Sequence, residues 1–250
     1  MAEVYLTAGA NSNRPTRRTG FVLTSANTMF LLAKPSPERI RQFLSAQRNA
    51  AFSYAEVGAS RDGAPSHYTV DHSRSKLGSG GDVFARAVEA LRRWEMFRLG
   101  WVQLLYPETP IEVGATVGIL VHRRALWSLN ACRIIYLVGG SQPSDNAGRG
   151  EESLAVESCQ KPAGRFVGPE DHVERYGFAY GTLEAHAESG EERFSIEWRR
   201  DDGSVWYDIL AFSRPNHVLA RLGYPLVRRL QKRFARDSHR AMLRAVASKE

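Results

Sequence analysis

Residues 176–212 read YGFAYGTLEAHAESGEERFSIEWRRDDGSVWYDILAF, and this stretch decides the fold. Apolar and polar residues alternate in three runs, which are 176–183, 191–198 and 204–212. A period of two residues is typical of β-strands. The links between the runs end in ESG and DDG, whose residues favour tight hairpin turns. The stretch therefore predicts an antiparallel meander of three strands.

Further strands are predicted upstream of this meander. Residues 114–122 and 127–138 are apolar runs separated by a short polar link, so the simplest expectation is a hairpin. A first strand is expected at 67–73. The glycine-rich segment 77–81 is expected to turn the chain from that strand into a helix.

Two helices are predicted in this upstream part of the chain. Ser36 can cap a short amphipathic helix that begins at Pro37, because proline suits the first helical position. A second helix is expected from residue 82 to about 99, where Gly100 ends it. Its apolar face has helical spacing and consists of Phe84, Ala87, Val88, Leu91 and Trp94.

A long C-terminal helix is predicted at 225–247. One of its stripes is apolar, and the opposite stripe carries Arg229, Lys232, Arg233, Arg236, Arg240 and Arg244. A sheet with one uncovered apolar face is not stable alone, so the apolar stripe is expected to cover the sheet. The predicted fold class is α+β, with a curved antiparallel sheet gripping the C-terminal helix and with additional helices nearer the N-terminus.

The chain has 250 residues, which favours one domain. Residues 1–28 show neither hydrophobic period and are expected to be a disordered extension, which leaves Met29 as an alternative start. Residues 29–250 are then a single domain, with a flexible insertion at about 139–172. The sequence has no apolar run of membrane-spanning length, no secretory signal and only two cysteines, so a cytoplasmic location is expected.

Four segments carry a resemblance to a known family. They are VFARAVEALRRWEMF at 83–97, FAYGTL at 178–183, GEERF at 190–194 and FSRP at 212–215. The sequence from about Met29 onward resembles bacterial and plant proteins grouped as domain of unknown function 1990. It is similar, more distantly, to the helix-grip superfamily of START and birch-allergen-like proteins. The resemblance implies a cavity between sheet and helix but supplies no catalytic residues.

The densest polar cluster straddles the first hairpin of the meander. Because side chains alternate along a strand, Phe178 and Thr182 share a face with a tyrosine and are candidates for the lining of a cavity. A histidine and carboxylates near the hairpin mouth could do acid/base chemistry. The alternative is a solvated hairpin tip with a surface Glu/Arg pair. The acid/base candidates are Tyr180, His186, Glu191 and Glu192.

A second group of candidates comprises arginines and tryptophans at or near strand ends. If these side chains converge inside a cup, they would suit a carboxylate or phosphate on an aromatic ligand. The alternative is that each arginine pairs with a neighbour and each tryptophan is part of the core. The members are Arg123, Trp127, Arg133, Trp206 and Arg214.

No metal site and no cofactor are predicted, since the seven histidines form no H-x-x-x-H pair and neither cysteine has a C-x-x-C partner. The leading hypothesis is a protein that binds a small hydrophobic or aromatic molecule in a cavity. The alternatives are a cyclase, dehydratase or hydrolase that uses the same cavity, and an interaction protein whose basic C-terminal helix meets nucleic acid or an anionic membrane surface. Of these partners, the small hydrophobic molecule is preferred.

Overall fold

The computed structural model describes residues 22–25, 28–139, 172–216 and 224–247. One nine-stranded antiparallel sheet contains all the named strands of these residues. The strands are β1 (Val22–Ser25), β2 (Thr28–Leu31), β3 (Thr69–Ser79), β4 (Val102–Leu105), β5 (Thr116–Arg123), β6 (Leu126–Val138), β7 (Val173–Thr182), β8 (Glu188–Arg199) and β9 (Ser204–Pro215). The helices are α1 (Pro37–Gln47), α2 (Gly81–Arg92) and α4 (Tyr224–Ala247), with short 3-10 turns η1 (Ala59–Arg61) and η2 (Glu95–Phe97).

The meander predicted from 176–212 is confirmed as β7, β8 and β9, which lie side by side in the sheet. The sheet runs β1-β2-β6-β7-β8-β9-β3, and β5 joins β4 to β6. The predicted hairpin is also present, because β5 and β6 pair antiparallel from Arg123 and Leu126 onward. The pairing of β7 with β8 places Tyr180 opposite Glu192, so their side chains can form a hydrogen bond on the inner face.

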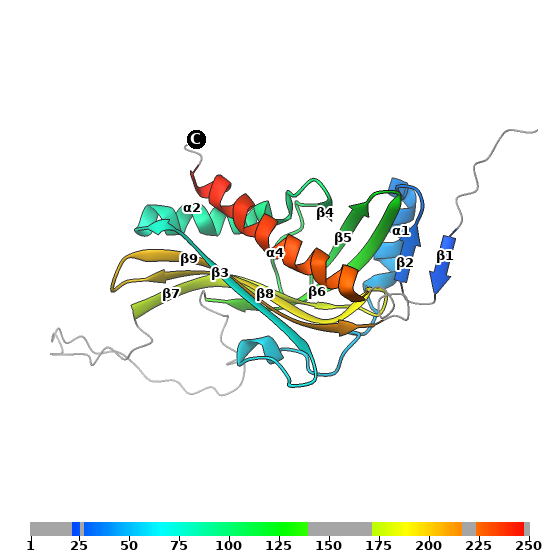
Figure 1. Cartoon of the computed structure of the whole chain (residues 1–250), viewed down its shortest axis with the longest axis horizontal. Coiled ribbons are helices and arrows are strands. Elements are labelled where there is room, and N and C mark those ends of the chain that lie inside the picture. Colours follow the sequence, from blue (N-terminus) through cyan, green and yellow to red (C-terminus); the bar gives the residue numbers. More distant parts are fainter. Residues whose placement is uncertain (1–21, 26–27, 140–171, 217–223, 248–250) are drawn as a thin grey trace, which may run out of the picture.

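Helix α4 crosses the inner face of the curved sheet, and α2 packs beside it (Figure 1). Met242 and Val246 of α4 are buried in one core cluster with Phe178 and Phe194 of the sheet. The predicted fold class, a curved antiparallel sheet gripping a C-terminal helix, is therefore confirmed. The opposite, outer face of the sheet is covered in part by α1 and by the segment that contains η1 (Figure 1).

The structure corrects the predicted extents of three elements. Strand β8 begins at Glu188, so residues 188–190, which were predicted as the hairpin link, belong to the strand, and the turn lies at 184–187. Strand β3 continues to Ser79 rather than ending at residue 73, because it stays paired with β9 as far as Ser204 through an irregularity after Lys76. Helix α2 ends at Arg92 rather than near Leu99. Trp94 has a left-handed backbone with a φ of 57°, and its indole is buried against Phe178 at a ring separation of 4.9 Å.

The structure also differs from the predicted N-terminal extension. Val22–Ser25 form β1, which pairs with β2, and β2 in turn pairs with β6. Residues 1–21 and most of the predicted insertion at 139–172 lie outside the described residues. None of the helices described is long and apolar enough to cross a membrane.

Candidate ligand-binding cavity

A cavity of about 490 Å³ lies between the inner face of the sheet and the first half of α4. Its apolar walls come from the sheet, from η2 and from α4, and they include Phe97, Ile119, Val121, Ile209, Leu230 and Phe234. Leu126 and Leu226 also line it and are 44% and 41% exposed, so the lining reaches the surface between the β5–β6 hairpin and the start of α4. The volume lies within the range of about 300–1,000 Å³ that is typical of ligand pockets.

Tyr180 and Glu192 form the polar pair on the inner face. The Tyr180 hydroxyl donates to Glu192 Oε2 at 2.6 Å, from β7 to the neighbouring residue on β8. Burial raises the pKa of the Glu192 carboxyl from its usual 4.5 to about 7, and the negative charge of Asp71 adds to the effect. Burial also holds the pKa of Tyr180 well above 10, so the phenol keeps its proton. The Glu192 side chain is enclosed by protein yet retains surface open to the cavity.

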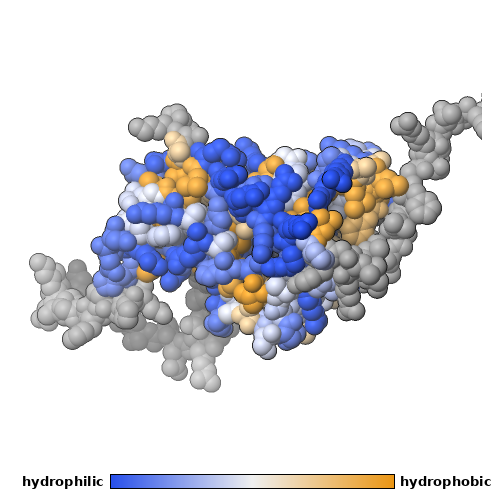
Figure 2. Space-filling view, in the orientation of Figure 1, coloured by the Kyte–Doolittle hydropathy of each residue, from blue (hydrophilic) through white to orange (hydrophobic). Residues whose placement is uncertain are grey.

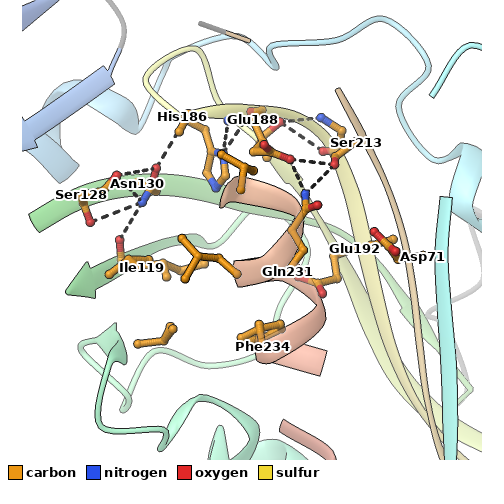
Figure 3. Close-up of a pocket in the computed structure, with 18 of the residues that line it drawn as sticks. Asp71, Ile119, Ser128, Asn130, His186, Glu188, Glu192, Ser213, Gln231 and Phe234 are labelled. Atoms are coloured by element: carbon orange, nitrogen blue, oxygen red, sulfur yellow. Dashed lines mark hydrogen bonds between the residues drawn. The ribbon is translucent and has the colours of Figure 1, made fainter. Parts of the chain in front are cut away.

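A second carboxyl, Glu188, lies two alternations before Glu192 on the same face of β8 (Figure 3). Its Oε2 accepts hydrogen bonds from Ser213 Oγ at 2.7 Å and from Gln231 Nε2, which reaches it from α4. Its Oε1 is buried and has no hydrogen-bond partner among the described residues. Burial raises the pKa of Glu188, as expected for a carboxylate that is incompletely solvated.

His186 lies on the cavity wall beside Glu188. Its Nδ1 is 3.0 Å from both the backbone nitrogen and the backbone oxygen of Glu188. Burial lowers the pKa of His186 to about 4, so its imidazole is neutral at pH 7. At neutral pH this histidine therefore contributes no positive charge to the site.

Asp71 of β3 lines the same cavity and is held by Arg228 of α4. The guanidinium binds both carboxylate oxygens, with Nη2 to Oδ1 at 2.7 Å, and its Nη1 also donates to Gln231 Oε1 at 2.6 Å. This chain of contacts joins the first half of α4 to the edge of the sheet. On the far wall, Asn130 of β6 is held by Ser128 and by the backbone of Ala187 (Figure 3).

Glu191, another acid/base candidate, has its carboxylate on the opposite side of the sheet from Glu192. It accepts hydrogen bonds from the Tyr54 hydroxyl at 2.9 Å, from the Ser60 backbone N–H at 3.1 Å and from the Gly58 backbone N–H. The residue is 3% exposed. Glu191 therefore anchors the segment that contains η1 to the outer face of the sheet.

The predicted hydroxyl lining is only partly present. Phe178 is fully buried in the core cluster and is not among the cavity-lining residues described. Thr182 lines the cavity, but its Oγ1 is 2.6 Å from Ser53 Oγ and bonds to the backbone of Gly190. Of the four acid/base candidates, the structure brings Tyr180 and Glu192 into contact and places His186 on the same cavity.

The predicted arginine and tryptophan group does not converge. Arg133 donates to the carbonyls of Gln47 and Arg48 at the end of α1, and Arg214 lies over the Tyr68 ring on the outer face. Trp127 stacks on His122, and Trp206 lies beside Arg74. Arg123 is half-buried at the end of β5. None of the five is among the residues described as lining the cavity. Alternation along the strands points Trp127, Arg133, Trp206 and Arg214 to the outer face.

The outer stripe of α4 is exposed and basic, as predicted. Arg233 and Arg236 both contact Asp237, and Arg233 also lies 4.5 Å from the centre of the Trp101 ring. Figure 2 shows hydrophilic side chains across the middle of this face of the molecule. The described residues contain no group of three metal-ligating side chains close enough to hold an ion.

The polar residues of the site that were not predicted from the sequence include Asp71, Glu188 and Gln231. A signal existed for Glu188, because it lies four residues before Glu192 on one strand and alternation puts the two on one face. The sequence carries no signal for Gln231, because its contacts with Glu188 and Ser213 depend on how α4 docks on the sheet.

The curved sheet, the covering helix and the cavity between them define a helix-grip protein. The chain belongs to the family described as "Domain of unknown function (DUF1990)", whose sequence pattern matches residues 53–241. This confirms the resemblance predicted from the sequence.

Two relatives match over nearly their whole length. The chain is 37% identical over 238 residues to a UPF0548 protein of Dictyostelium discoideum, covering 89% of this chain and 98% of that protein. It is 35% identical over 229 residues to a UPF0548 protein of Deinococcus radiodurans, covering 87% and 98%. Among solved structures, Ara h 8.0201 has a TM-score of 0.40 and 10% identity, covering 73% of this chain and 99% of that one.

The role of Glu191 gives a first prediction. Glu191→Ala leaves the Tyr54 hydroxyl and two backbone N–H groups without their charged acceptor, so it should lower the free energy of unfolding by at least about 3 kcal/mol. Urea denaturation measures this. The matched control is Glu184→Ala, at an exposed position, which should change stability by less than about 0.5 kcal/mol. Equal stability of the two variants would contradict the anchoring role.

Glu192 gives a prediction about pH. Its pKa is raised in the folded state to about 7, so its contribution to stability is fully present below pH 4.5 and is lost as the pH rises through 7. Glu192→Gln stays neutral, so above pH 7 it should be more stable than the wild type by up to about 3 kcal/mol, and this gain should vanish near pH 4.5. Thermal unfolding from pH 4.5 to 8 measures the difference. The same gain at both ends of the range would show that ionisation is not its cause, and Glu184→Gln is the control.

Proposed function

We propose that the protein binds a small hydrophobic or aromatic molecule in the cavity beneath α4. The observation that carries this proposal is a cavity of about 490 Å³ that has apolar walls, a few polar groups and an opening to the surface. Apolar walls contribute affinity through burial, whereas a small number of fixed polar groups orients the ligand. Tyr180 and Glu192 are the polar groups best placed for that purpose, because their side chains face the cavity and are held to each other.

Ala235 of α4 provides the test, because its side chain lines the cavity. We expect the wild type to bind the neutral fluorescent probe N-phenyl-1-naphthylamine with one-to-one stoichiometry. Ala235→Trp should abolish binding, because an indole fills the space the probe would occupy. The matched control is Ala85→Trp, an exposed alanine on α2, which should bind like the wild type. Fluorescence titration and circular dichroism report binding and folding together, and undiminished binding by folded Ala235→Trp would refute the proposal.

A second candidate, acid/base catalysis in the same cavity, is favoured by one observation. Glu192 titrates near neutral pH and touches a phenol that keeps its proton, so the pair can both accept and donate a proton at pH 7. His186 is neutral at pH 7 but is a weak base there because of its low pKa, and Glu191 is excluded because its carboxylate lies on the other face of the sheet.

The fate of the bound molecule separates these two functions. A molecule that co-purifies with the protein is extracted, identified by mass spectrometry and incubated with fresh protein. Binding alone returns it unchanged. Catalysis should convert it, and Glu192→Gln should then slow the conversion by about 100-fold or more, the usual contribution of a general acid or base. Conversion at an unchanged rate in Glu192→Gln would remove Glu192 from any catalytic role.

A further inference from the structure

The charges of the cavity differ in sign from those of the protein. The whole chain has 34 basic and 27 acidic residues and a net charge of +7. Among the described residues that line the cavity there is no lysine or arginine, whereas the acids Asp71, Glu188 and Glu192 direct their side chains toward it. A ligand in the cavity therefore meets carboxyl groups and hardly any positive charge.

The nearest cations are already engaged. Arg228 binds both oxygens of Asp71 and also donates to Gln231, so the charge of this pair is largely cancelled. His186 carries no charge at pH 7, because burial keeps its pKa at about 4. Neither Glu188 nor Glu192 forms a salt bridge with the described residues, although the charge of nearby Arg228 acts to lower the pKa of Glu188.

Both of these carboxyls have hydrogen-bonding capacity that the described residues leave unused. The Oε1 atom of Glu188 is buried and has no hydrogen-bond partner among the residues described. Glu192 receives one hydrogen bond from Tyr180, at Oε2, and its other oxygen accepts none from the part of the chain that the structure describes. Buried carboxylates with vacant acceptor positions are costly, and a donor carrying positive charge relieves that cost best.

The aromatic walls favour the same kind of ligand. Phe97, Trp101, Tyr180 and Phe234 all line the cavity, and Phe97 and Tyr180 have ring centres 6.4 Å apart. The faces of aromatic rings attract an ammonium group, whereas they do not attract a carboxylate. Carboxyls and rings therefore act in the same direction.

We propose that the cavity selects an organic amine, with the ammonium group bound at Glu192 and an apolar or aromatic body held between the sheet and α4. This rests on the proposed function, since it names the class of ligand for the same cavity. A carboxylic acid of the same shape is rejected, because its charge would face Glu188 and Glu192 with no free cation in the described lining to balance it.

Three molecules that differ only in their polar end test this selectivity. They are 2-(1-naphthyl)ethylamine, 2-(1-naphthyl)ethanol and 1-naphthylacetate, each titrated calorimetrically into the wild type at pH 8. We expect the amine to bind at least about tenfold more tightly than the alcohol, as a charge-assisted hydrogen bond provides, and the acid to bind more weakly than the alcohol. In Glu192→Gln the preference for amine over alcohol should disappear. Glu197→Gln removes a carboxylate from the outer face of the same strand and should retain the preference.

The affinity for the amine should also depend on pH, whereas the affinity for the alcohol should not. Glu192 loses its proton around pH 7, so amine affinity should rise about tenfold from pH 6 to pH 8, while the ligand itself stays protonated. Tyr180, Tyr207 and Cys132 face Glu192 and stay protonated in this range, because burial raises the pKa of each. Asp71 is paired with Arg228. The pKa of Glu188 is also raised, so Glu188→Gln is measured in parallel to distinguish its titration from that of Glu192.

Failure of this inference is distinct from failure of the proposed function. If N-phenyl-1-naphthylamine binds and Ala235→Trp abolishes its binding, but the acid binds as tightly as the amine, the cavity is a binding site and amine selectivity is wrong. Amine selectivity through Glu192 is equally wrong if Glu192→Gln retains the preference for the amine. If neither the neutral probe nor any of the three naphthyl compounds binds, both proposals fall.

Discussion

The docking of α4 on the inner face of the sheet is the interaction on which the rest of the structure depends. Its second half is core, since Met242 is fully buried and Val246 is 4% exposed. Its first half instead forms the roof of the cavity, through Leu230, Phe234 and their neighbours. One helix thus completes the hydrophobic core at one end and leaves a cavity, open to the surface, at the other. Apolar packing alone does not position the roof, because a cavity provides fewer contacts than a filled core.

Polar contacts fix the roof in place. Arg228 binds Asp71 on β3, and Gln231 reaches both Ser213 on β9 and Glu188 on β8. Further along the helix, His239 contacts Ser73 and Ser75 on β3, and the Ser238 hydroxyl is 2.9 Å from that of Tyr207. These bonds lie along the β3–β9 side of the sheet. On its other side α4 meets Trp101, which donates to Asp237, and Phe97. The helix is therefore held from two sides above the cavity.

The fold could be predicted largely from the sequence because it follows from local periodicity. The alternation of apolar and polar residues predicted β7, β8 and β9, and the apolar stripe at 225–247 predicted α4. The end of α2 could not be predicted in this way, because Trp94 leaves the helix to bury its indole against Phe178, and that partner is 84 residues away in the chain. The site was predictable only in part. Tyr180 and Glu192 follow from neighbouring strands, but Asp71 and Gln231 join the site through the crossing of α4 over β3, which no local pattern encodes.

Glu191 and Glu192 illustrate how alternation gives adjacent residues different tasks. On the outer face, the Glu191 carboxylate accepts hydrogen bonds from three donors, which stabilise its negative charge. These hydrogen bonds hold the segment that contains η1 against the sheet. Glu192 has one donor and lies against the cavity, where removal from water favours its protonated form. A carboxyl kept in this condition lowers the stability of the empty protein at neutral pH. A bound cation would reverse that loss, so ligand affinity and folding stability are linked through the same residue.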